Sequence, residues 1–408
     1  MLGADAGRLP DAEARRLAAA GVALAEPGDG SELLASVATV VKSPGVPASA
    51  PVIRAAREAG IPVLGELEVA WRLLPQRFLA VTGSNGKTTS VELLGAMHRA
   101  AGREAVVAGN VGTALSSLVG ALAPDATVVC EASSFQLEDA VAFAPEVGVL
   151  LNITSDHLDR HGTLDAYRAA KLRLFSAQPA SAVAVLPGDL SDPVGGAARR
   201  VFFAAGGRAD LAERDGRLWW HGDELMPVGD IRLPGRHNVE NAMASAAAAL
   251  SAGLPAEAVV AGLRDFAGVE HRLETVAAID GVTYVNDSKA TNVASAAVGI
   301  ASFPRGVHVI LGGRGKGEDY FPLLEPVRRS CRAVYLIGEA APAIGTALAG
   351  ARVALHDCGD LERAVAAARA AASPGDVVLL SPACASFDQY SSFEQRGAHF
   401  RALVSAIT

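Results

Sequence analysis

The 408-residue sequence predicts an α/β protein in which helices cover both faces of parallel sheets. Two observations lead to this prediction. From residue 78 onward, short apolar runs typical of buried strands alternate with helical segments, which is the pattern of strand–helix–strand crossovers. The chain is also too long for a single hydrophobic core, so we expect two or three domains.

Composition excludes several classes of protein. Half of the residues are apolar and 20% are charged, as in ordinary globular proteins. The net charge of −8 argues against a nucleic-acid partner but leaves small anionic substrates open, because cations can gather in a cleft. No apolar run approaches the ~20 residues of a membrane span, and no signal-peptide pattern is present. Four scattered cysteines without a Cys-x-x-Cys pair indicate reduced thiols in the cytoplasm.

Three domains are expected along the chain. In residues 1–76 the pattern predicts a helix over 11–20, a strand over 36–41 and, at 75–77, a linker. In residues 77–268 we expect strands over 78–82, 127–132, 146–153 and 181–186, a hairpin near 216–222, and an Ala-rich helix over 242–252. In residues 269–408 we expect strands over 282–286, 307–312, 333–337 and 377–380, and a helix over 360–372.

A phosphate-binding loop is predicted at Thr82-Gly83-Ser84-Asn85-Gly86-Lys87-Thr88-Thr89. An apolar strand precedes this segment, and an amphipathic helix that ends near Gly102 follows it. Backbone N–H groups at the helix start would face an anion, Lys87 would supply a point charge, and Thr88 would offer its hydroxyl to Mg²⁺. Val81 takes the place of the first glycine of the standard motif, and an ordinary strand–helix turn is the alternative. We predict an ATP-binding loop.

Two further strands end in polar side chains. Glu131 closes the strand 127–132, where an acid could reach a metal on a triphosphate; a surface or capping glutamate is the alternative. The strand 146–153 runs into Asp156 and His157, which could hold Mg²⁺ or orient a polar substrate. Helix capping explains Asp156 equally well, but His157 is expected at the same sheet edge as Lys87. Nothing in the local pattern distinguishes Lys171 from a solvated helix lysine.

Asn238 and Asn241 open the long Ala-rich helix and, three residues apart, share one face of its first turn. Capping explains one asparagine better than two, and an amide pair could contact adenine. Four polar clusters follow at strand ends, and together they predict a binding cleft on one sheet edge. These clusters are 270–272, 286–292, 312–317 and 381–388, the last running on to 393–397.

In this order the motifs resemble the Mur ligase family of ATP-dependent amide-forming enzymes in peptidoglycan synthesis. The matching segments are Thr-Gly-Ser-Asn-Gly-Lys-Thr-Thr, Glu131, Asn-Ile-Thr with Asp-His-Leu-Asp-Arg-His, Tyr-Arg-Ala-Ala-Lys and His-Asn-x-x-Asn. The segments Asn-Asp-Ser-Lys-Ala-Thr-Asn, Gly-Gly-x-x-Lys and Ser-Pro-Ala-Cys-Ala-Ser-Phe-Asp resemble the D-glutamate-adding branch. The resemblance covers about residues 36–404. It implies a three-domain architecture of Rossmann-like parallel-sheet domains around a central P-loop ATPase domain.

The resemblance assigns roles to the nucleotide-site residues. Lys87, with its loop neighbours from Gly83 to Thr89, would bind the ATP phosphates, and Thr88 the first Mg²⁺. Glu131 and His157 would be metal ligands, and Lys171 would be carbamylated to become an anionic Mg²⁺ ligand. The remaining ATP contacts would be Asn238 and Asn241 to adenine, Arg272 to the γ-phosphate, Asp287 to ribose, and Lys289 in the nucleotide cleft.

The same resemblance implies two further substrates. The D-glutamate pocket would comprise Thr291, Lys316, Ser386 and Phe393, and Asn110 would contact a UDP-linked muramoyl substrate. Ser133 and Phe387, in the segments of Glu131 and Ser386, are placed with the substrate-binding residues. The family's opening strand and Gly-rich turn are not recognisable before Ser43-Pro44-Gly45. Either the start codon was assigned too late or the UDP site is truncated, and we expect a reduced, truncated first domain. The implied protein is a cytoplasmic monomer that requires ATP and Mg²⁺, does not insert into membranes and binds no nucleic acid.

The implied chemistry is activation of a carboxylate to an acyl phosphate, followed by attack of the D-glutamate amine. Three alternatives remain: a superfamily ligase with another donor or acceptor, such as a folate-polyglutamate or cyanophycin-type enzyme; a P-loop kinase or ATPase; and a non-catalytic relative. The third expected domain distinguishes a ligase from a P-loop kinase, because a kinase has no need of Lys316, Ser386 and Phe393 over its nucleotide.

Overall fold

The computed structural model describes residues 1–5, 9, 11–25, 28, 30–110, 113–154, 156–205, 209–315 and 317–407. The chain divides into two compact units. One unit comprises Met1–Pro227 and Ala242–Gly262, and the other comprises Val228–Asn241 and Leu263–Thr408. Each unit contains a large, mostly parallel sheet, which confirms the predicted α/β class.

The first 73 residues form two small parallel sheets, β1 with β2 and β3 with β4. Their elements are β1 (Leu2–Gly3), α1 (Asp11–Ala19), β2 (Ala23–Leu24), the 3-10 turn η1 (Ser31–Ser36), β3 (Val40–Lys42), α2 (Pro51–Glu58), β4 (Val63–Gly65) and α3 (Glu66–Leu73).

Two expectations for this segment need correction. The strand predicted over 36–41 is wrong at its start, because Ser36 ends η1 and donates its hydroxyl to the Leu33 carbonyl at 3.0 Å. A short strand, Leu2–Gly3, does open the chain, although the sequence predicted none. Residues 6–8, where a turn would follow it, lie outside the described residues. The shortened first domain therefore stays a prediction.

The first unit is built on a nine-stranded sheet in the order β13-β12-β11-β10-β9-β8-β5-β7-β6. Pairing is parallel from β6 to β11 and antiparallel from β11 to β13, so the hairpin predicted near 216–222 is confirmed. The strands are β5 (Arg77–Thr82), β6 (Ala105–Gly109), β7 (Thr127–Glu131), β8 (Val147–Leu150), β9 (Val183–Pro187), β10 (Arg199–Ala205), β11 (Leu211–Arg214), β12 (Arg217–Trp220) and β13 (Asp223–Pro227).

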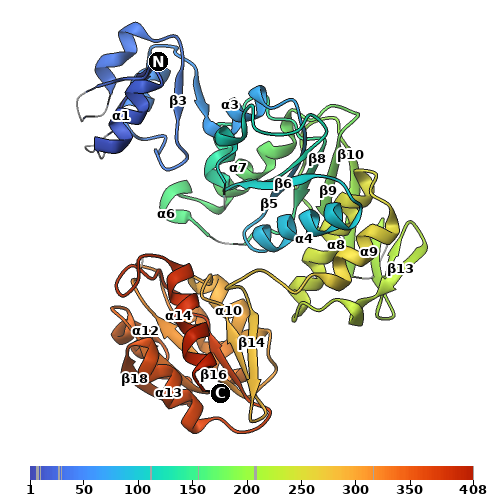
Figure 1. Ribbon diagram of the computed structural model, residues 1–408, viewed down its shortest axis with the longest axis vertical. Helices are drawn as coiled ribbons and strands as arrows, with labels where there is room; N and C mark the ends of the chain where they lie inside the picture. The colour runs from blue at the N-terminus through green and yellow to red at the C-terminus, as the bar shows by residue number, and fades with distance from the viewer. Residues whose placement is uncertain are drawn as a thin grey trace. The chain divides into compact units, whose positions relative to one another are not determined.

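Helices cover both faces of this sheet (Figure 1). On one face, α4 packs against α8 and α9: Ser245 donates to the Ser90 carbonyl at 3.3 Å, and Gly262 lies against Met97. On the other face, Phe78 of β5 packs with α3 and α7. The helices and 3-10 turns between residues 87 and 265 are α4 (Lys87–Ala100), η2 (Leu115–Leu118), α5 (Ser134–Leu137), α6 (Leu158–His161), α7 (Leu164–Ser176), η3 (Val228–Asp230), α8 (Arg236–Ser251) and α9 (Ala256–Asp265).

The second unit contains a six-stranded sheet in the order β14-β15-β19-β16-β17-β18, parallel except at the edge strand β14. Its strands are β14 (Glu274–Ile279), β15 (Val282–Asn286), β16 (Val307–Gly312), β17 (Cys331–Ile337), β18 (Ala354–Gly359) and β19 (Val377–Leu380). Its helices and turn are α10 (Val293–Ala301), η4 (Phe321–Leu323), α11 (Leu324–Ser330), α12 (Ala341–Ala347), α13 (Leu361–Ala371) and α14 (Phe393–Ser405).

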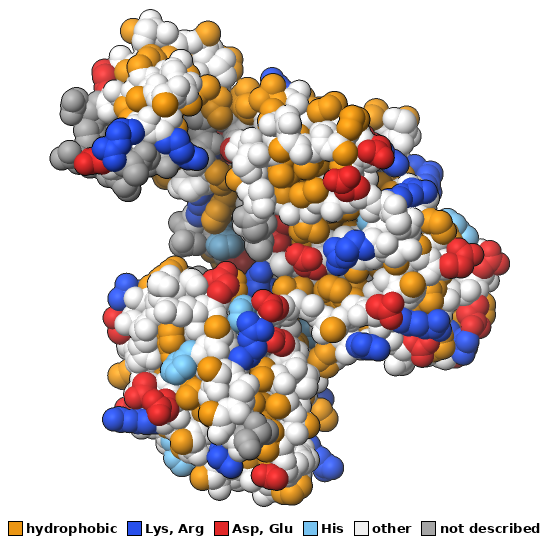
Figure 2. Space-filling view, viewed as in Figure 1, with side chains coloured by type: hydrophobic (Ala, Val, Ile, Leu, Met, Phe, Trp, Pro, Cys, Tyr) orange, Lys and Arg blue, Asp and Glu red, His pale blue; other side chains and the backbone are white. Residues whose placement is uncertain are grey.

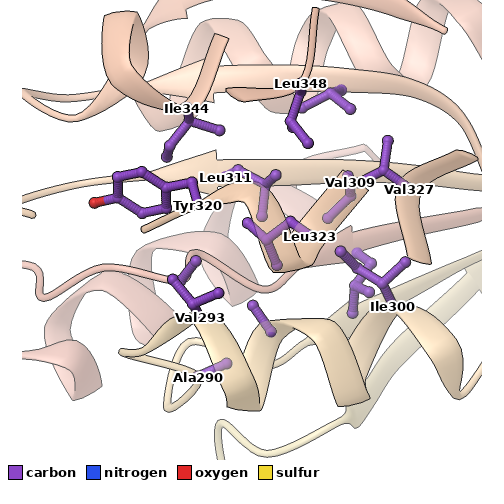
Figure 3. Close-up of a cluster of buried hydrophobic side chains, with 14 of the residues drawn as sticks. Ala290, Val293, Ile300, Val309, Leu311, Tyr320, Leu323, Val327, Ile344 and Leu348 are labelled. Carbon is purple, nitrogen blue, oxygen red and sulfur yellow. The ribbon is translucent and has the colours of Figure 1, made fainter. Parts of the chain in front are cut away.

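Successive side chains of β16 point to opposite faces of the sheet and pack into the two hydrophobic cores of this unit. Val309 and Leu311 pack with Ile300 of α10 and Ile344 of α12 on one face (Figure 3). Ile310 points to the other face and joins the cluster built on α13 and α14. Burial on both faces explains why β16 is apolar throughout except for the buried His308.

The described surface is mixed in charge. On the face drawn in Figure 2, lysine and arginine side chains are interspersed with aspartate and glutamate on each unit. In the part of the chain that the structure describes, no helix combines the length and the apolar character needed to cross a membrane.

Candidate active site

The predicted phosphate loop connects β5 to α4 as the sequence indicates. Gly86 is the N-cap of α4 with φ 88°, a left-handed conformation that favours glycine. A Cβ at Gly83 would stand 2.9 Å from the Leu151 Cβ, so a side chain is excluded there as well. The N–H groups at the start of α4 and the glycine turn before it have the architecture of an anion-binding site.

Neighbouring segments brace this loop. Asn152, just beyond β8, accepts the Asn85 N–H at 2.9 Å and donates its amide to the Asn85 carbonyl at 3.1 Å. The Ser84 hydroxyl donates to the Thr154 carbonyl at 3.0 Å and lies 3.0 Å from the Tyr167 hydroxyl. The loop is therefore fixed before any ligand binds, which lowers the entropy cost of binding phosphate.

Two lysines that are distant from each other in the sequence contact the loop. Lys87 donates to the carbonyls of Gly83 and Ser84 at 2.8 and 3.0 Å. Lys171 of α7, only 1% exposed, donates to the same Gly83 carbonyl at 2.8 Å and lies over the Tyr167 ring at 4.4 Å. Burial, and then the charge of Lys87, lowers the pKa of Lys171 well below its ordinary value. Lys171 is thus a member of the site and not a solvated surface lysine.

Thr88 and Glu131 meet at the carboxyl edge of the sheet, 43 residues apart in sequence. The Thr88 hydroxyl donates to Glu131 Oε2 at 2.8 Å, and the Asn110 amide donates to Oε1 at 2.9 Å. Thr88 and Glu131 are 5% and 2% exposed. Close by in the loop, the buried Thr89 hydroxyl makes no hydrogen bond within the described part of the chain. Thr88 and Glu131, both predicted as metal ligands, are thus in contact, and Asn110, predicted to contact the UDP-linked substrate, bonds to the same carboxylate.

The Thr88–Glu131 pair fits magnesium by its chemistry. Mg²⁺ prefers oxygen ligands and is commonly held by one or two carboxylates together with substrate phosphates. A hydroxyl and a carboxylate beside a phosphate loop supply that donor set. Among the described residues, no three or more His, Cys, Asp and Glu side chains gather into a protein-only metal centre.

His157 lies in a cluster of rings beside the loop. Its backbone is left-handed at φ 50°, and its side chain is 45% exposed. The ring centroid lies 4.8 Å from that of Phe135 and 6.4 Å from that of Tyr167. His157 is therefore linked to the phosphate loop through Tyr167, whose hydroxyl contacts Ser84. Ser133, also predicted, caps α5 and bonds with Gln136.

The other predicted nucleotide residues belong to the second unit. Asn241 donates its amide to Asn238 Oδ1 at 3.2 Å, and Asn238 donates to the Pro234 carbonyl at 2.7 Å. Both side chains are buried in the first turn of α8. Arg272 lies near His237, whose pKa is lowered to about 4, first by burial and then by the charge of Arg272. The Arg272 Nε is buried without a hydrogen bond among the described residues, which leaves a donor available for an anion.

Asp287 is held at the end of β15 by two donors. The Ser381 hydroxyl donates to its Oδ2 at 2.7 Å, and the Leu273 N–H donates to Oδ1 at 3.3 Å. Complete burial raises the pKa of Asp287 to about 7, while these bonds and Arg272 act in the opposite direction. His271 and Leu273 both have positive φ, so the backbone of this turn is strained.

Three of the predicted polar clusters converge around Arg396. Its guanidinium is buried and donates to the carbonyls of Ser288 and Cys384 at 2.9 and 3.1 Å. The strand-end loops 286–292 and 381–388 are therefore joined, and a bridge between Arg314 and Ala385 adds the loop that follows β16. The sequence prediction that these clusters share one sheet edge is confirmed.

The predicted acceptor residues are placed as follows. The buried Ser386 hydroxyl has no hydrogen-bond partner among the described residues. The Lys289 ammonium lies 5.5 Å from the centroid of the Phe393 ring. Thr291 follows Lys289 in the same turn, and its N–H donates to the Lys289 carbonyl at 2.8 Å. Phe387 is 61% exposed. Lys316 lies outside the described residues.

Sequence reasoning missed several residues that shape the site. Asn152 and Tyr167 brace the phosphate loop, and Ser381 and Arg396 organise the second cluster. A weak indication existed for two of them. Asn152 is a polar residue at a strand end, and Tyr167 precedes Lys171 by four residues, which places both on one helix face.

Comparison with known families gives two matches. The Mur ligase middle domain matches residues 81–249, and the Mur ligase glutamate ligase domain matches residues 271–384. Together these matches span more than half of the chain. They include the phosphate-loop residues and the site residues from 271 to 384, whereas Ser386, Phe387, Phe393 and Arg396 lie beyond the second match.

Three curated relatives are each named UDP-N-acetylmuramoylalanine–D-glutamate ligase. The chain is 45% identical to that of Acidobacterium capsulatum over 95% of this chain and 86% of the relative. It is 42% identical to that of Pelotomaculum thermopropionicum over 99% and 92% of the two chains. It is 46% identical to that of Anaeromyxobacter dehalogenans over 90% and 83%.

Solved structures share the fold. A UDP-N-acetylmuramate-alanine ligase from Thermotoga maritima superposes with TM-score 0.64 at 18% identity, covering 100% of this chain and 94% of that one. A MurF ligase from the same organism, in complex with ADP, superposes with TM-score 0.64 at 19% identity, covering 92% and 97%. The family matches and the identity to curated relatives agree with the arrangement of the site. This chain belongs to the Mur ligase family.

Proposed function

We propose that this chain joins D-glutamate to UDP-N-acetylmuramoyl-L-alanine, with conversion of ATP to ADP and phosphate, in peptidoglycan synthesis. One observation carries the proposal. The phosphate loop, with Lys87, Lys171 and the Thr88–Glu131 pair around it, lies in a chain more than 40% identical to D-glutamate ligases over nearly its whole length.

The first unit would bind the ATP phosphates. N–H groups of the loop and the start of α4 would hold phosphate oxygens, with Lys87 exchanging its carbonyl contacts for a phosphate. Thr88 and Glu131 would hold Mg²⁺, and Lys171 would join them if its amine is carbamylated. When bound, the metal would neutralise charge that develops during phosphoryl transfer. Asn238, Asn241, Arg272, Asp287 and Lys289 would contact the rest of the nucleotide.

The chemistry has two steps. The carboxylate of the UDP-linked substrate attacks the γ-phosphorus, and its new O–P bond replaces the bond to ADP. The D-glutamate amine, having lost a proton, then attacks the acyl carbon, and the tetrahedral intermediate expels phosphate to leave an amide. His157 would hold a second Mg²⁺ near the carboxylate of the first substrate, and Asn110 and Ser133 would contact that substrate. Exclusion of water would protect the acyl phosphate from hydrolysis.

The loops joined by Arg396 would form the acceptor pocket. The Ser386 hydroxyl has no hydrogen-bond partner within the described ranges, and Thr291 and Phe393 belong to the same loops. Lys316 would supply the cation for the side-chain carboxylate. A dicarboxylic amino acid needs such a cation together with hydroxyl donors. Phe387, which is exposed, would contact the substrate at the rim of this pocket.

We further propose a monomeric, cytoplasmic enzyme of three domains, 1–76, 77–268 and 269–408. All four cysteines are free, as expected where thiols stay reduced. We also infer that it binds no nucleic acid, because its net charge is −8. We infer as well that it does not insert into membranes.

Phosphate release measured with each substrate omitted in turn tests this function. The proposal requires release that depends on both D-glutamate and the UDP-linked substrate. Release without either would indicate a simple ATPase, use of another amino acid or donor would indicate a different ligase, and no release in any mixture would indicate a non-catalytic relative.

A further inference from the structure

The loop 43–47 follows the carboxyl end of β3 and is anchored on one side. Arg160 donates to the Pro44 carbonyl at 2.9 Å and to the Val46 carbonyl at 3.4 Å. Lys42 donates to the same Val46 carbonyl at 2.9 Å. On the other side, a Cβ added at Gly45 would meet nothing within 4 Å. The Pro44 and Val46 carbonyls are therefore held in place, and the space beside Gly45 is open to a ligand.

The two anchoring cations are held by consecutive carboxylates. Arg160 donates to Glu138 at 3.1 Å, and Lys42 pairs with Asp139 at 2.6 Å. Glu138 and Asp139 follow α5, which begins three residues after Glu131. A short, rigid segment thus connects the anchors of the loop to the strand end that carries the predicted metal ligand.

Arg160 also reaches the ring cluster of the site. Its guanidinium carbon lies 4.1 Å from the Phe135 ring centroid, and the Phe135 ring contacts His157. The second oxygen of Glu138 lies 3.2 Å from His161, whose ring stacks on Phe135. Arg160 therefore touches the loop, the carboxylate and the ring that supports His157.

From this geometry we propose that Arg160 is a positioning residue that fixes the loop 43–47 relative to His157 for binding of the UDP-linked sugar. This inference rests on the proposed function. Ligands bind beyond the carboxyl ends of parallel strands, which is where the loop lies. A substrate with a nucleoside diphosphate at one end and a reacting carboxylate at the other must be held at both ends. One planar guanidinium can bridge two carbonyls, a carboxylate and a ring, which a lysine ammonium cannot do.

Arg160 is a better probe than Lys42. The Lys42 and Asp139 side chains are 2% and 3% exposed, so removing either leaves a buried charge and threatens folding. Arg160 is 15% exposed. The matched control is Arg173 of the same unit: among the described residues its guanidinium donates to the Ala140 carbonyl, at 3.3 and 2.8 Å, and not to the loop 43–47.

The experiment is steady-state titration of all three substrates on Arg160→Met, Arg160→Lys and Arg173→Met, with calorimetric binding of the UDP-linked substrate without ATP. Loss of two carbonyl bonds should raise KM and Kd for the UDP-linked substrate about tenfold in Arg160→Met and less in Arg160→Lys. KM for ATP and D-glutamate should stay within about twofold, and Arg173→Met should match the wild type.

An unchanged Kd for the UDP-linked substrate, or an equal rise in all three KM values, would overturn the proposal. If Arg160→Met does not fold, Arg160→Lys and Glu138→Gln carry the same test. Failure of the proposed function is distinguishable, because the wild type itself would then show no phosphate release that depends on D-glutamate.

Discussion

Lys87 and Lys171 donate hydrogen bonds to the same atom, the carbonyl oxygen of Gly83, each at 2.8 Å. Two ammonium groups on one carbonyl repel each other, and the more buried of them is Lys171. Its lowered pKa follows from that position. This repulsion is relieved if Lys87 moves to a phosphate or if Lys171 loses its positive charge. We expect both changes in the working enzyme.

Lys87→Ala should abolish ATP-dependent product formation, with a loss of at least about a hundredfold, because a preorganised cation on the phosphates is removed. Folding should be retained, since the Lys87 ammonium donates to two carbonyls of its own loop and the side chain is half-buried. The measurement is product formation by chromatography, with thermal unfolding as the control. Near wild-type turnover would contradict the phosphate-loop assignment.

Lys171→Ala should be far less active and partly rescued by short-chain carboxylates such as acetate. The added carboxylate would replace the carbamate oxygen on Mg²⁺, and the deleted side chain leaves room for it. The same additive should not rescue Lys87→Ala, and Arg173→Ala on the same helix should need no rescue. A nucleotide-bound crystal structure with an unmodified Lys171 directed to solvent would refute carbamylation.

Ser386→Ala should raise KM for D-glutamate about three- to tenfold, the worth of one hydrogen bond. It should not lower the melting temperature, because the hydroxyl it removes is buried without a partner among the described residues. The control is Ser381→Ala, which loses a 2.7 Å bond to Asp287 and should be destabilised by about 1 kcal/mol or more. Equal destabilisation of both variants would mean that Ser386 is a structural residue.

Asp287 should make stability fall as pH rises. The pKa of Asp287 is raised from 3.8 to about 7 in the folded chain. Its contribution to the free energy of unfolding is therefore complete below about pH 4 and is lost as pH rises through about 7. A rise of this size corresponds to at most on the order of 4 kcal/mol. Scanning calorimetry at pH 5 and pH 8 should show a smaller fall in melting temperature for Asp287→Asn than for the wild type.

Asp388→Asn is the control for that measurement, because Asp388 accepts the Glu339 N–H at 3.0 Å nearer the surface of the same unit. It should keep the wild-type pH dependence. If Asp287→Asn also keeps it, Asp287 is ionised in the folded chain at neutral pH.

Sequence reasoning predicted best what local pattern and topology determine. The strand, glycine turn and lysine of the phosphate loop are contiguous, so their geometry follows from ten residues. Thr88 and Glu131 are distant in sequence, but both follow parallel strands, and the carboxyl ends of such strands meet at one edge. The clusters around Arg396 were predicted to converge for the same reason.

What the sequence did not predict depends on neighbours that no local pattern specifies. Of the strands that were missed, β6, β14 and β18 each lie at an edge of their sheet, where the apolar run of a doubly covered strand is absent. The strand β10 was missed as well, although it lies inside the nine-stranded sheet between β9 and β11. Asn152 and Tyr167 stand at the start of the matching segments Asn-Ile-Thr and Tyr-Arg-Ala-Ala-Lys, but their roles arise only when β8 and α7 lie beside the phosphate loop.

The hairpin that ends the nine-stranded sheet has a consequence for self-association. An edge strand presents unpaired backbone groups to which a strand of another chain can add. On β13, Asp223 and Glu224 are exposed, and Pro227 has no N–H to donate. A second copy approaching this edge would meet like charges and an interrupted ladder. The last strand of the sheet thus discourages edge-to-edge polymerisation of an enzyme that must stay dispersed to meet three diffusing substrates.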